Sequence, residues 1–125
     1  MIPLNVVVRP DFTVPAKLTT GDRVAVVSPS FAAPGMFPAV HEVAMQRLRE
    51  DFGLEPVEYP TTRRLNSSPQ DRAADLMSAF ADPAVRAVLA TIGGDDQLTV
   101  LPFLDPRLWL PTRNPSSATA TTRTC

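Results

Sequence analysis

The chain has 125 residues, a net charge of −1 at neutral pH and an apolar fraction of 44%. This length suffices for one domain with a hydrophobic core, or for part of a larger domain. Basic residues do not cluster, which argues against nucleic acid or an anionic membrane as the main partner. No apolar run approaches the roughly 20 residues that cross a bilayer, and the start lacks the basic region of a signal peptide. We therefore predict a cytoplasmic protein, and its one cysteine, Cys125, excludes an internal disulfide.

The first strand is expected soon after the start of the chain. Residues 1–22 are predicted as an extended lead-in that ends in a turn. Residues 23–30, RVAVVSPS, are a β-branched apolar run closed by Ser-Pro-Ser, which is typical of a buried strand that feeds a loop. Residues 31–35 are predicted to be that loop.

A helix is predicted over residues 36–52. Its apolar residues recur at helical spacing, at Phe37, Val40, Ala44 and Leu48. We expect Gly53 to end this helix and His41 to lie on its polar side, facing solvent. Residues 54–60 alternate in polarity and predict a second strand, which Pro56 places near a sheet edge.

A second helix has clear start and stop signals. Ser68 can cap its first turn, Pro69 suits the first helical position, and Asp71 stands where a capping box has its acid. Asp82 and Pro83 are expected to stop the helix. Its buried stripe is predicted to be Ala73, Leu76, Met77 and Phe80.

The remaining elements complete an α/β pattern. Residues 84–92, AVRAVLATI, predict a third strand that is covered on both faces, because they are nearly all apolar. After a glycine pair, residues 96–104 predict a short helix that Asp95 or Asp96 can cap. The alternating order of strands and helices predicts a parallel sheet in a three-layer, flavodoxin- or Rossmann-like α/β domain.

Two loops are candidates for a binding site, because ligands bind at the carboxyl ends of the strands in an open parallel sheet. One loop is Ser28-Pro29-Ser30, and the other is Gly93-Gly94-Asp95-Asp96. The free N–H groups of a glycine pair beside a helix start suit a phosphate, a carboxylate or a reaction oxyanion. The residues alone favour a simpler interpretation, a tight turn with an aspartate cap. The spacing and the missing lysine exclude a Rossmann fingerprint and a P-loop.

Other chemistry is weakly indicated. Ser28 and Ser30 follow a strand as a nucleophile would, but the chain has no second histidine that could activate either of them. Asp95 and Asp96 could form an acid pair, although adjacent acids at a helix start usually cap it. Because no Cys/His cluster is present, we predict no metal site and no cofactor.

Three stretches together resemble the N-terminal half of the LD-carboxypeptidase family of serine peptidases. They are LTTGDRVAVVSPS at 18–30, SPQDRAADLMSAFADPAVRAVLATIGGDDQ at 68–97 and LPFLDP at 101–106. The resemblance covers roughly residues 17–108. Within the family, IGGDDQLTVLPFLD is more similar to the microcin C immunity protein branch than to the muropeptide branch, which usually shows R-G-G-Y-G there.

The resemblance implies a cytoplasmic hydrolase, usually a homodimer, whose substrate is a muropeptide or a peptidyl-adenylate. It implies a Ser–Glu–His triad on an α/β domain, which is followed by a second, mostly β domain. It also places Gly93 and Gly94 at the oxyanion-hole backbone of the family. With Asp95 they are our candidate oxyanion and substrate-binding residues.

The chain departs from the family after Leu108, because the expected N-P-K…G-Y-S-D segment with the nucleophilic serine is absent. Residues 117–125, SATATTRTC, can be encoded so that regrouping from the last base of codon 116 spells F-G-Y-S-D-N-T-N-L. The same shift lets the residues before them spell A-A-N-P-K-P-F. We interpret this as a frameshift near residues 105–109, with an intrinsically disordered tail as the alternative.

We therefore divide the chain into a lead-in at 1–22, a partial N-terminal α/β domain at 23–108 and an aberrant, out-of-frame, disordered tail at 109–125. No catalytic residue of the family is expected in it, so we predict an inactive product whose open sheet edge favours aggregation. Two alternatives stay open. The chain could be a non-catalytic fragment that binds a ligand or dimerises with an intact relative, or a flavodoxin-like nucleotide-binding module.

Overall fold

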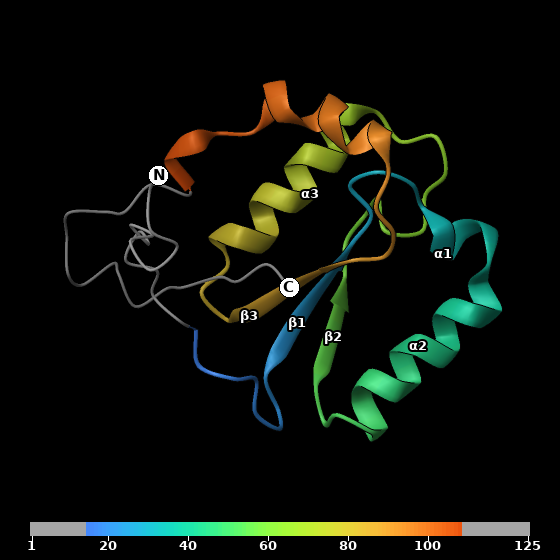
Figure 1. Cartoon of the computed structure of the whole chain (residues 1–125), viewed down its shortest axis with the longest axis vertical. Helices are drawn as coiled ribbons and strands as arrows, with labels where there is room; N and C mark the ends of the chain where they lie inside the picture. Colours follow the sequence, from blue (N-terminus) through green and yellow to red (C-terminus); the bar gives the residue numbers. More distant parts are fainter. Residues whose placement is uncertain (1–14, 109–125) are drawn as a thin grey trace, which may run out of the picture.

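The computed structural model describes residues 15–108 and shows a parallel three-stranded sheet between helices, with the strand order β2-β1-β3 (Figure 1). The predicted three-layer α/β fold is thus confirmed. The first fourteen residues of the lead-in and the whole segment 109–125 lie outside the described residues, so the predictions made for them stay predictions.

The strands lie where the sequence predicted them, but they are shorter. The central strand β1 spans Arg23–Val27, and its neighbours are β2, Glu55–Glu58, and β3, Val85–Ala90. All three run parallel, with Val24 opposite both Pro56 and Ala87. The edge position predicted for the second strand is confirmed, and it suits Pro56 because an edge strand has one side free of hydrogen bonds.

Helices α1 and α2 follow β1. The segment predicted as a loop contains the short helix α1, Ala33–Met36, whose four residues are too few to show a helical period. Helix α2 spans Pro38–Glu50. The chain then turns at Gly53, where φ is +65° and the Leu54 N–H donates to the Leu48 carbonyl at 2.9 Å, as expected for a C-terminal glycine.

Helix α3, Pro69–Ala81, begins and ends as its local signals predicted. The hydroxyl oxygen of Ser68 accepts a hydrogen bond from the Asp71 N–H at 3.1 Å. At the other end, the Asp82 side chain accepts one from the Ala84 N–H at 2.9 Å, which fixes the turn into β3.

The segment after β3 is a 3₁₀ helix, η1, over Asp95–Phe103, and not the predicted α-helix. Pro102 lies inside it and has no N–H to donate, which disfavours a regular α-helix. A second 3₁₀ turn, η2, covers Pro106–Leu108.

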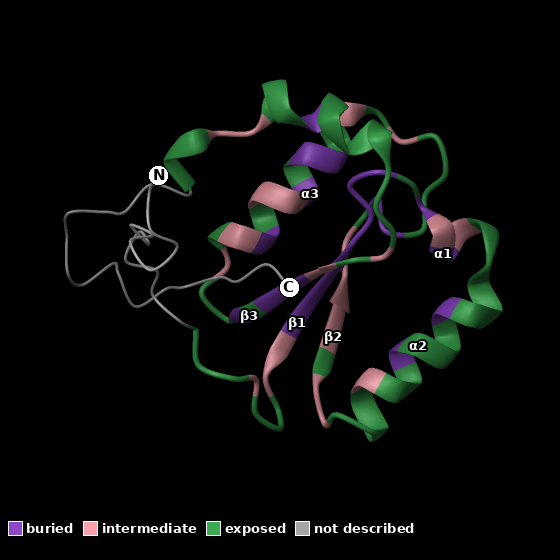
Figure 2. Ribbon diagram, in the orientation of Figure 1, coloured by how far each residue is buried: buried purple, intermediate pink, exposed green. Residues whose placement is uncertain are grey.

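The hydrophobic core lies between the sheet and α3. It contains residues from β1, from α3 and from β3: Ala25, Val27, Ala79, Val85 and Val88. Figure 2 shows that burial is concentrated on the central strands, while α2 is mostly exposed. Successive side chains of a strand point to opposite faces, so Val24 and Val26 face the α2 side. The part of the chain that the structure describes has no helix long and apolar enough to span a membrane.

Candidate functional site

The loops that follow β1 and β3 meet at the carboxyl edge of the sheet, where the sequence placed the candidate site. The Thr91 N–H donates to the Val27 carbonyl at 2.9 Å, and the Thr91 and Ser28 hydroxyls lie 2.8 Å apart. The two loops are thus joined where each strand ends, as the parallel order requires.

Ser28 has a structural role. Its side chain is 2% exposed, and its hydroxyl donates to the Thr62 carbonyl at 2.8 Å. The Thr62 hydroxyl in turn donates to the Val26 carbonyl at 2.7 Å. These bonds tie the loops after β1, β2 and β3 together, and the Ser28 hydroxyl faces the interior instead of a substrate.

The glycine pair presents unengaged N–H groups. Within residues 15–108, neither the Gly93 N–H nor the Gly94 N–H donates a hydrogen bond, and both residues are exposed. A Cβ at Gly94 would lie 2.6 Å from the Ser30 Oγ, so close packing favours glycine there. A Cβ at Gly93 would meet nothing within 4 Å. The backbone around Gly93 therefore faces open space, which a ligand could occupy.

The two aspartates after the glycine pair do not cap the helix, contrary to our expectation. Gly94 is the N-cap residue of η1, and no side chain accepts a hydrogen bond there. Asp95 and Asp96 are exposed and lie in the first turn of η1. No group of three or more His, Cys, Asp or Glu residues within 15–108 is arranged to hold a metal ion.

Arg72 is a buried residue at this edge that the sequence did not single out. It lies in the first turn of α3 and is 8% exposed. Its Nη1 donates to the carbonyls of Pro29 at 2.7 Å and Ser30 at 3.0 Å, and at 3.4 Å to that of Asp96. Its Nη2 donates to the Thr99 hydroxyl at 3.2 Å. The sequence signal that could have pointed to Arg72 is its place in Asp-Arg-Ala, directly before Ala73, which was predicted to be buried.

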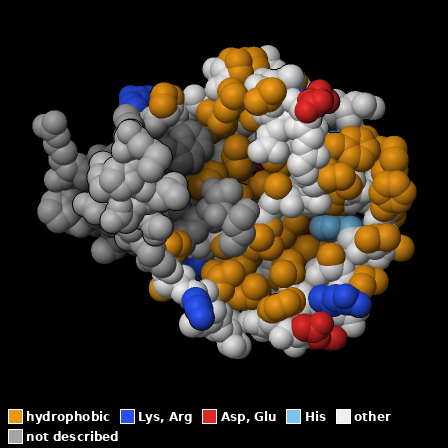
Figure 3. Space-filling view, in the orientation of Figure 1, with side chains coloured by type: hydrophobic (Ala, Val, Ile, Leu, Met, Phe, Trp, Pro, Cys, Tyr) orange, Lys and Arg blue, Asp and Glu red, His pale blue; other side chains and the backbone are white. Residues whose placement is uncertain are grey.

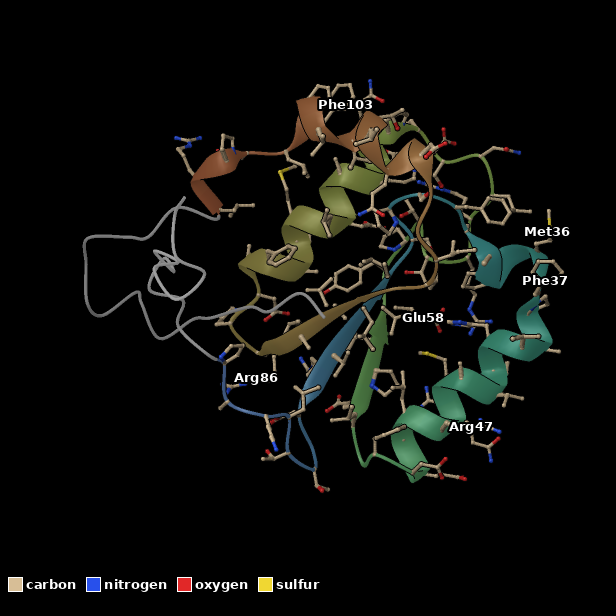
Figure 4. All side chains as sticks on the ribbon, in the orientation of Figure 1. Met36, Phe37, Arg47, Glu58, Arg86 and Phe103 are labelled. Atoms are coloured by element: carbon tan, nitrogen blue, oxygen red, sulfur yellow. The ribbon has the colours of Figure 1, made fainter. Side chains whose placement is uncertain are left out.

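His41 is buried, and the prediction that it faces solvent is wrong. It is 7% exposed, and its Nε2 lies 3.1 Å from a carboxylate oxygen of Glu58. Glu58, at the end of β2, is labelled in Figure 4. The Arg63 guanidinium also binds Glu58 and reaches Glu42 on α2. Hydrogen bonding to Arg63, opposed by burial, holds the pKa of Glu58 below its usual value. These contacts come from residues distant in sequence, so helical periodicity could not reveal them.

An apolar groove of about 570 Å³ runs along the α2 side of the sheet. Its lining includes Val26 and Leu89 from the strands and the stripe predicted for α2, Phe37, Val40, Ala44 and Leu48. Figure 3 shows hydrophobic side chains gathered over this part of the molecule, around the single histidine. Arg86 and Ala90 are exposed and Leu89 is only half-buried, which corrects the prediction that β3 is covered on both faces.

The sequence profile described as "LD-carboxypeptidase N-terminal domain" matches residues 24–117, about three-quarters of the chain. The chain belongs to this family. The match confirms the resemblance inferred from the Ser-Pro-Ser, Asp-Arg-Ala and Gly-Gly motifs, and it includes the glycine pair and Arg72.

Relatives of this LD-carboxypeptidase-family chain are much longer than it is. A Streptomyces coelicolor protein named as a carboxypeptidase is 41% identical over an alignment of 87 residues that covers 64% of this chain and 27% of that protein. The structure of an MccF-like protein from Bacillus anthracis is similar with a TM-score of 0.70 and 32% identity, over 78% of this chain and 30% of that one. The microcin C7 self-immunity protein MccF, solved with aspartyl sulfamoyl adenosine, has the same fold at 24% identity and a TM-score of 0.70, over 77% of this chain and 30% of that one. The chain thus spans less than a third of the proteins it matches.

Proposed function

We propose that this chain is the N-terminal part of a cytoplasmic serine carboxypeptidase that hydrolyses an amide bond, and that the 125-residue product is inactive by itself. The observation that carries the proposal is the glycine pair. In a chain of the LD-carboxypeptidase family, two exposed, unengaged N–H groups lie at the carboxyl edge of a parallel sheet. Such a turn suits the negative oxygen that develops when an amide carbonyl is attacked.

The proposed reaction follows the serine-hydrolase scheme. A serine hydroxyl attacks the carbonyl carbon, a histidine takes its proton, and a glutamate orients the histidine. The carbonyl oxygen becomes an oxyanion that the Gly93 and Gly94 N–H groups stabilise. The intermediate expels the amine, which takes the proton from the histidine, and water then hydrolyses the acyl-enzyme. In this scheme the chain supplies the oxyanion turn and needs no cofactor.

The nucleophile is proposed to lie in another reading frame. The sequence contains no Gly-Tyr-Ser-Asp motif, but residues 117–125 regroup to one after a one-base shift in allowed codons. We place the boundary between the family domain and the aberrant tail at Leu108, although the match to the family profile extends to residue 117.

The substrate is proposed to be an analogue of a peptidyl- or aminoacyl-adenylate with an amide-like link, with a muropeptide as the rival within the family. Support comes from the fold shared with the self-immunity protein that was solved with aspartyl sulfamoyl adenosine. In such a ligand a sulfamoyl group stands for the phosphate of the adenylate, and its link to the amino acid resembles an amide.

Two measurements test the proposal. Nucleotide sequencing of the locus from the codon of Leu104 onward should show codons that regroup to Gly-Tyr-Ser-Asp. The frame-restored protein should then cleave aspartyl sulfamoyl adenosine or an LD-linked tetrapeptide, while the 125-residue chain and the restored protein with Ser→Ala in that motif should not. The proposal would be contradicted if the codons after that of Leu104 do not regroup to Gly-Tyr-Ser-Asp. It would also be contradicted if the 125-residue chain hydrolyses either substrate by itself.

A further inference from the structure

The turn that contains Gly93 and Gly94 is anchored by hydrogen bonds at its two ends. Upstream, Thr91 is held by the Val27 carbonyl and the Ser28 hydroxyl. Between Thr91 and the first bond of η1, from the Gln97 N–H to the Gly94 carbonyl at 3.1 Å, no hydrogen bond within the described residues restrains the turn. The position of the Gly93 and Gly94 N–H groups therefore depends on how the downstream end is anchored.

Arg72 provides that downstream anchor. One guanidinium donates to the carbonyls of Pro29 and Ser30 in the loop after β1, and also to the Asp96 carbonyl and the Thr99 hydroxyl in η1. The planar fork of arginine can reach both segments at once, whereas the single ammonium of lysine cannot reproduce that geometry.

The energetics argue that this anchor serves more than packing. Arg72 is 8% exposed, it forms no ion pair with a carboxylate in residues 15–108, and its Nε has no hydrogen-bond partner there. A buried charge that only neutral oxygens compensate is costly, and removal of the guanidinium would leave the carbonyls of the buried residues Pro29 and Ser30 without this donor. The acceptors lie in two separate segments, so the bonds of Arg72 join the loop after β1 to η1, which lies beside the glycine turn.

We infer that Arg72 is the positioning residue of the Gly93–Gly94 turn: its guanidinium locks the start of η1 to the Ser28–Ser30 loop and so fixes the direction of the two N–H groups. This inference rests on the proposed oxyanion role for its importance. Arg72 acts through the backbone of η1, so it is not itself a catalytic residue.

The test measures the order of the turn in the ¹⁵N-labelled 125-residue chain and needs no substrate. In the wild type, relaxation should give Gly93 and Gly94 order parameters near the rigid value of about 0.85. In Arg72→Ala and in Arg72→Lys they should fall to about 0.6 or lower. The matched control is Asp75→Ala, which removes another buried charged side chain of α3 that binds the loop after β2 instead.

Chemical rescue separates positioning from general destabilisation. Guanidinium ion, at millimolar concentrations well below those that unfold proteins, should restore the order of the turn in Arg72→Ala, while urea, its neutral isostere, should not. Unchanged order parameters in Arg72→Ala, an equal loss in Asp75→Ala, or equal rescue by urea would overturn the inference. If Arg72→Ala does not fold, the folded Arg72→Lys variant decides the question. Order parameters of Gly93 and Gly94 near the wild-type value would overturn the inference, and lowered values would support it. A negative result leaves the proposed hydrolase function intact, because turnover is not measured.

Discussion

Asp75 is predicted to be the aspartate of α3 on which the stability of the described domain depends most. Its side chain is 7% exposed, and one carboxylate oxygen accepts hydrogen bonds from the Thr61 N–H at 2.7 Å and the Thr61 hydroxyl at 2.6 Å. Thr61 is only 2% exposed, so bulk water does not reach its two donors in the native structure. The bond fixes the loop after β2 to α3, which packs on β1 and β3.

The magnitude follows from the two donors. A buried donor left without a partner costs about 1–3 kcal/mol, and the Thr61 hydroxyl can rotate toward another acceptor while its N–H cannot. We therefore expect Asp75→Ala to lower the free energy of unfolding by about 2–4 kcal/mol, a large part of the about 5–15 kcal/mol that stabilises a typical domain. Asp75→Asn keeps an oxygen acceptor and should lose less.

The control is Asp71→Ala, one helical turn earlier. Asp71 is exposed and pairs with Arg64 at 3.1 Å, and its loss should cost at most about 1 kcal/mol. Urea unfolding of both variants, followed by circular dichroism, gives the two values, and equal slopes against urea confirm that they are comparable. An Asp75→Ala value no larger than the Asp71→Ala value would refute the argument that burial of the Thr61 donors decides the cost.

Two further predictions use the same measurement. Gly35→Ala should lower the free energy of unfolding by about 1–3 kcal/mol, because its Cβ would overlap the Arg63 carbonyl oxygen, whereas Gly93→Ala should change it by less than about 0.5 kcal/mol; equal effects would contradict this difference. The pKa of Glu58 is lowered chiefly by hydrogen bonding to Arg63, so its stabilisation is present above the unfolded-state glutamate pKa of about 4.3 and is lost as pH falls through the lower folded value. Glu58→Gln should cost at most about 1 kcal/mol at pH 7, and that difference should vanish in acid; a difference independent of pH would refute the assignment.

The sequence predicted the parts of the fold that depend on interactions between residues a few positions apart. The start of α3 depends on Ser68 and Pro69, and the end of α2 depends on Gly53; these residues satisfy or terminate backbone hydrogen bonds within a few positions. Three parallel strands followed from two apolar runs, one segment of alternating polarity and the order of strands and helices. The 3₁₀ geometry of η1 was missed, because the short helix was predicted from an aspartate cap after the glycine pair and the missing N–H of Pro102 was not considered.

The polar residues around the candidate site could not be predicted in the same way. His41, Arg72 and Asp75 all lie on helices, where a charged or polar side chain normally indicates a solvated face. Each is buried because its partner lies on another element, at Glu58, Pro29 and Thr61 respectively. Such partnerships exist only after the chain has folded, so they require knowledge of which loops meet at the carboxyl edge of the sheet.

The exposed apolar stripe of α2 follows from the topology of the sheet. Ala25 and Val27 of β1 pack with Ala79 of α3, so α3 covers one face of β1 and β3. On the other face, α2 packs on β2, while Val26 and Leu89 line the open groove. A parallel strand is normally covered on both faces, and no helix within residues 15–108 covers this side of β3. The helical spacing of Phe37, Val40, Ala44 and Leu48 therefore predicted the helix correctly. It could not show that these residues line an open groove instead of packing on the sheet.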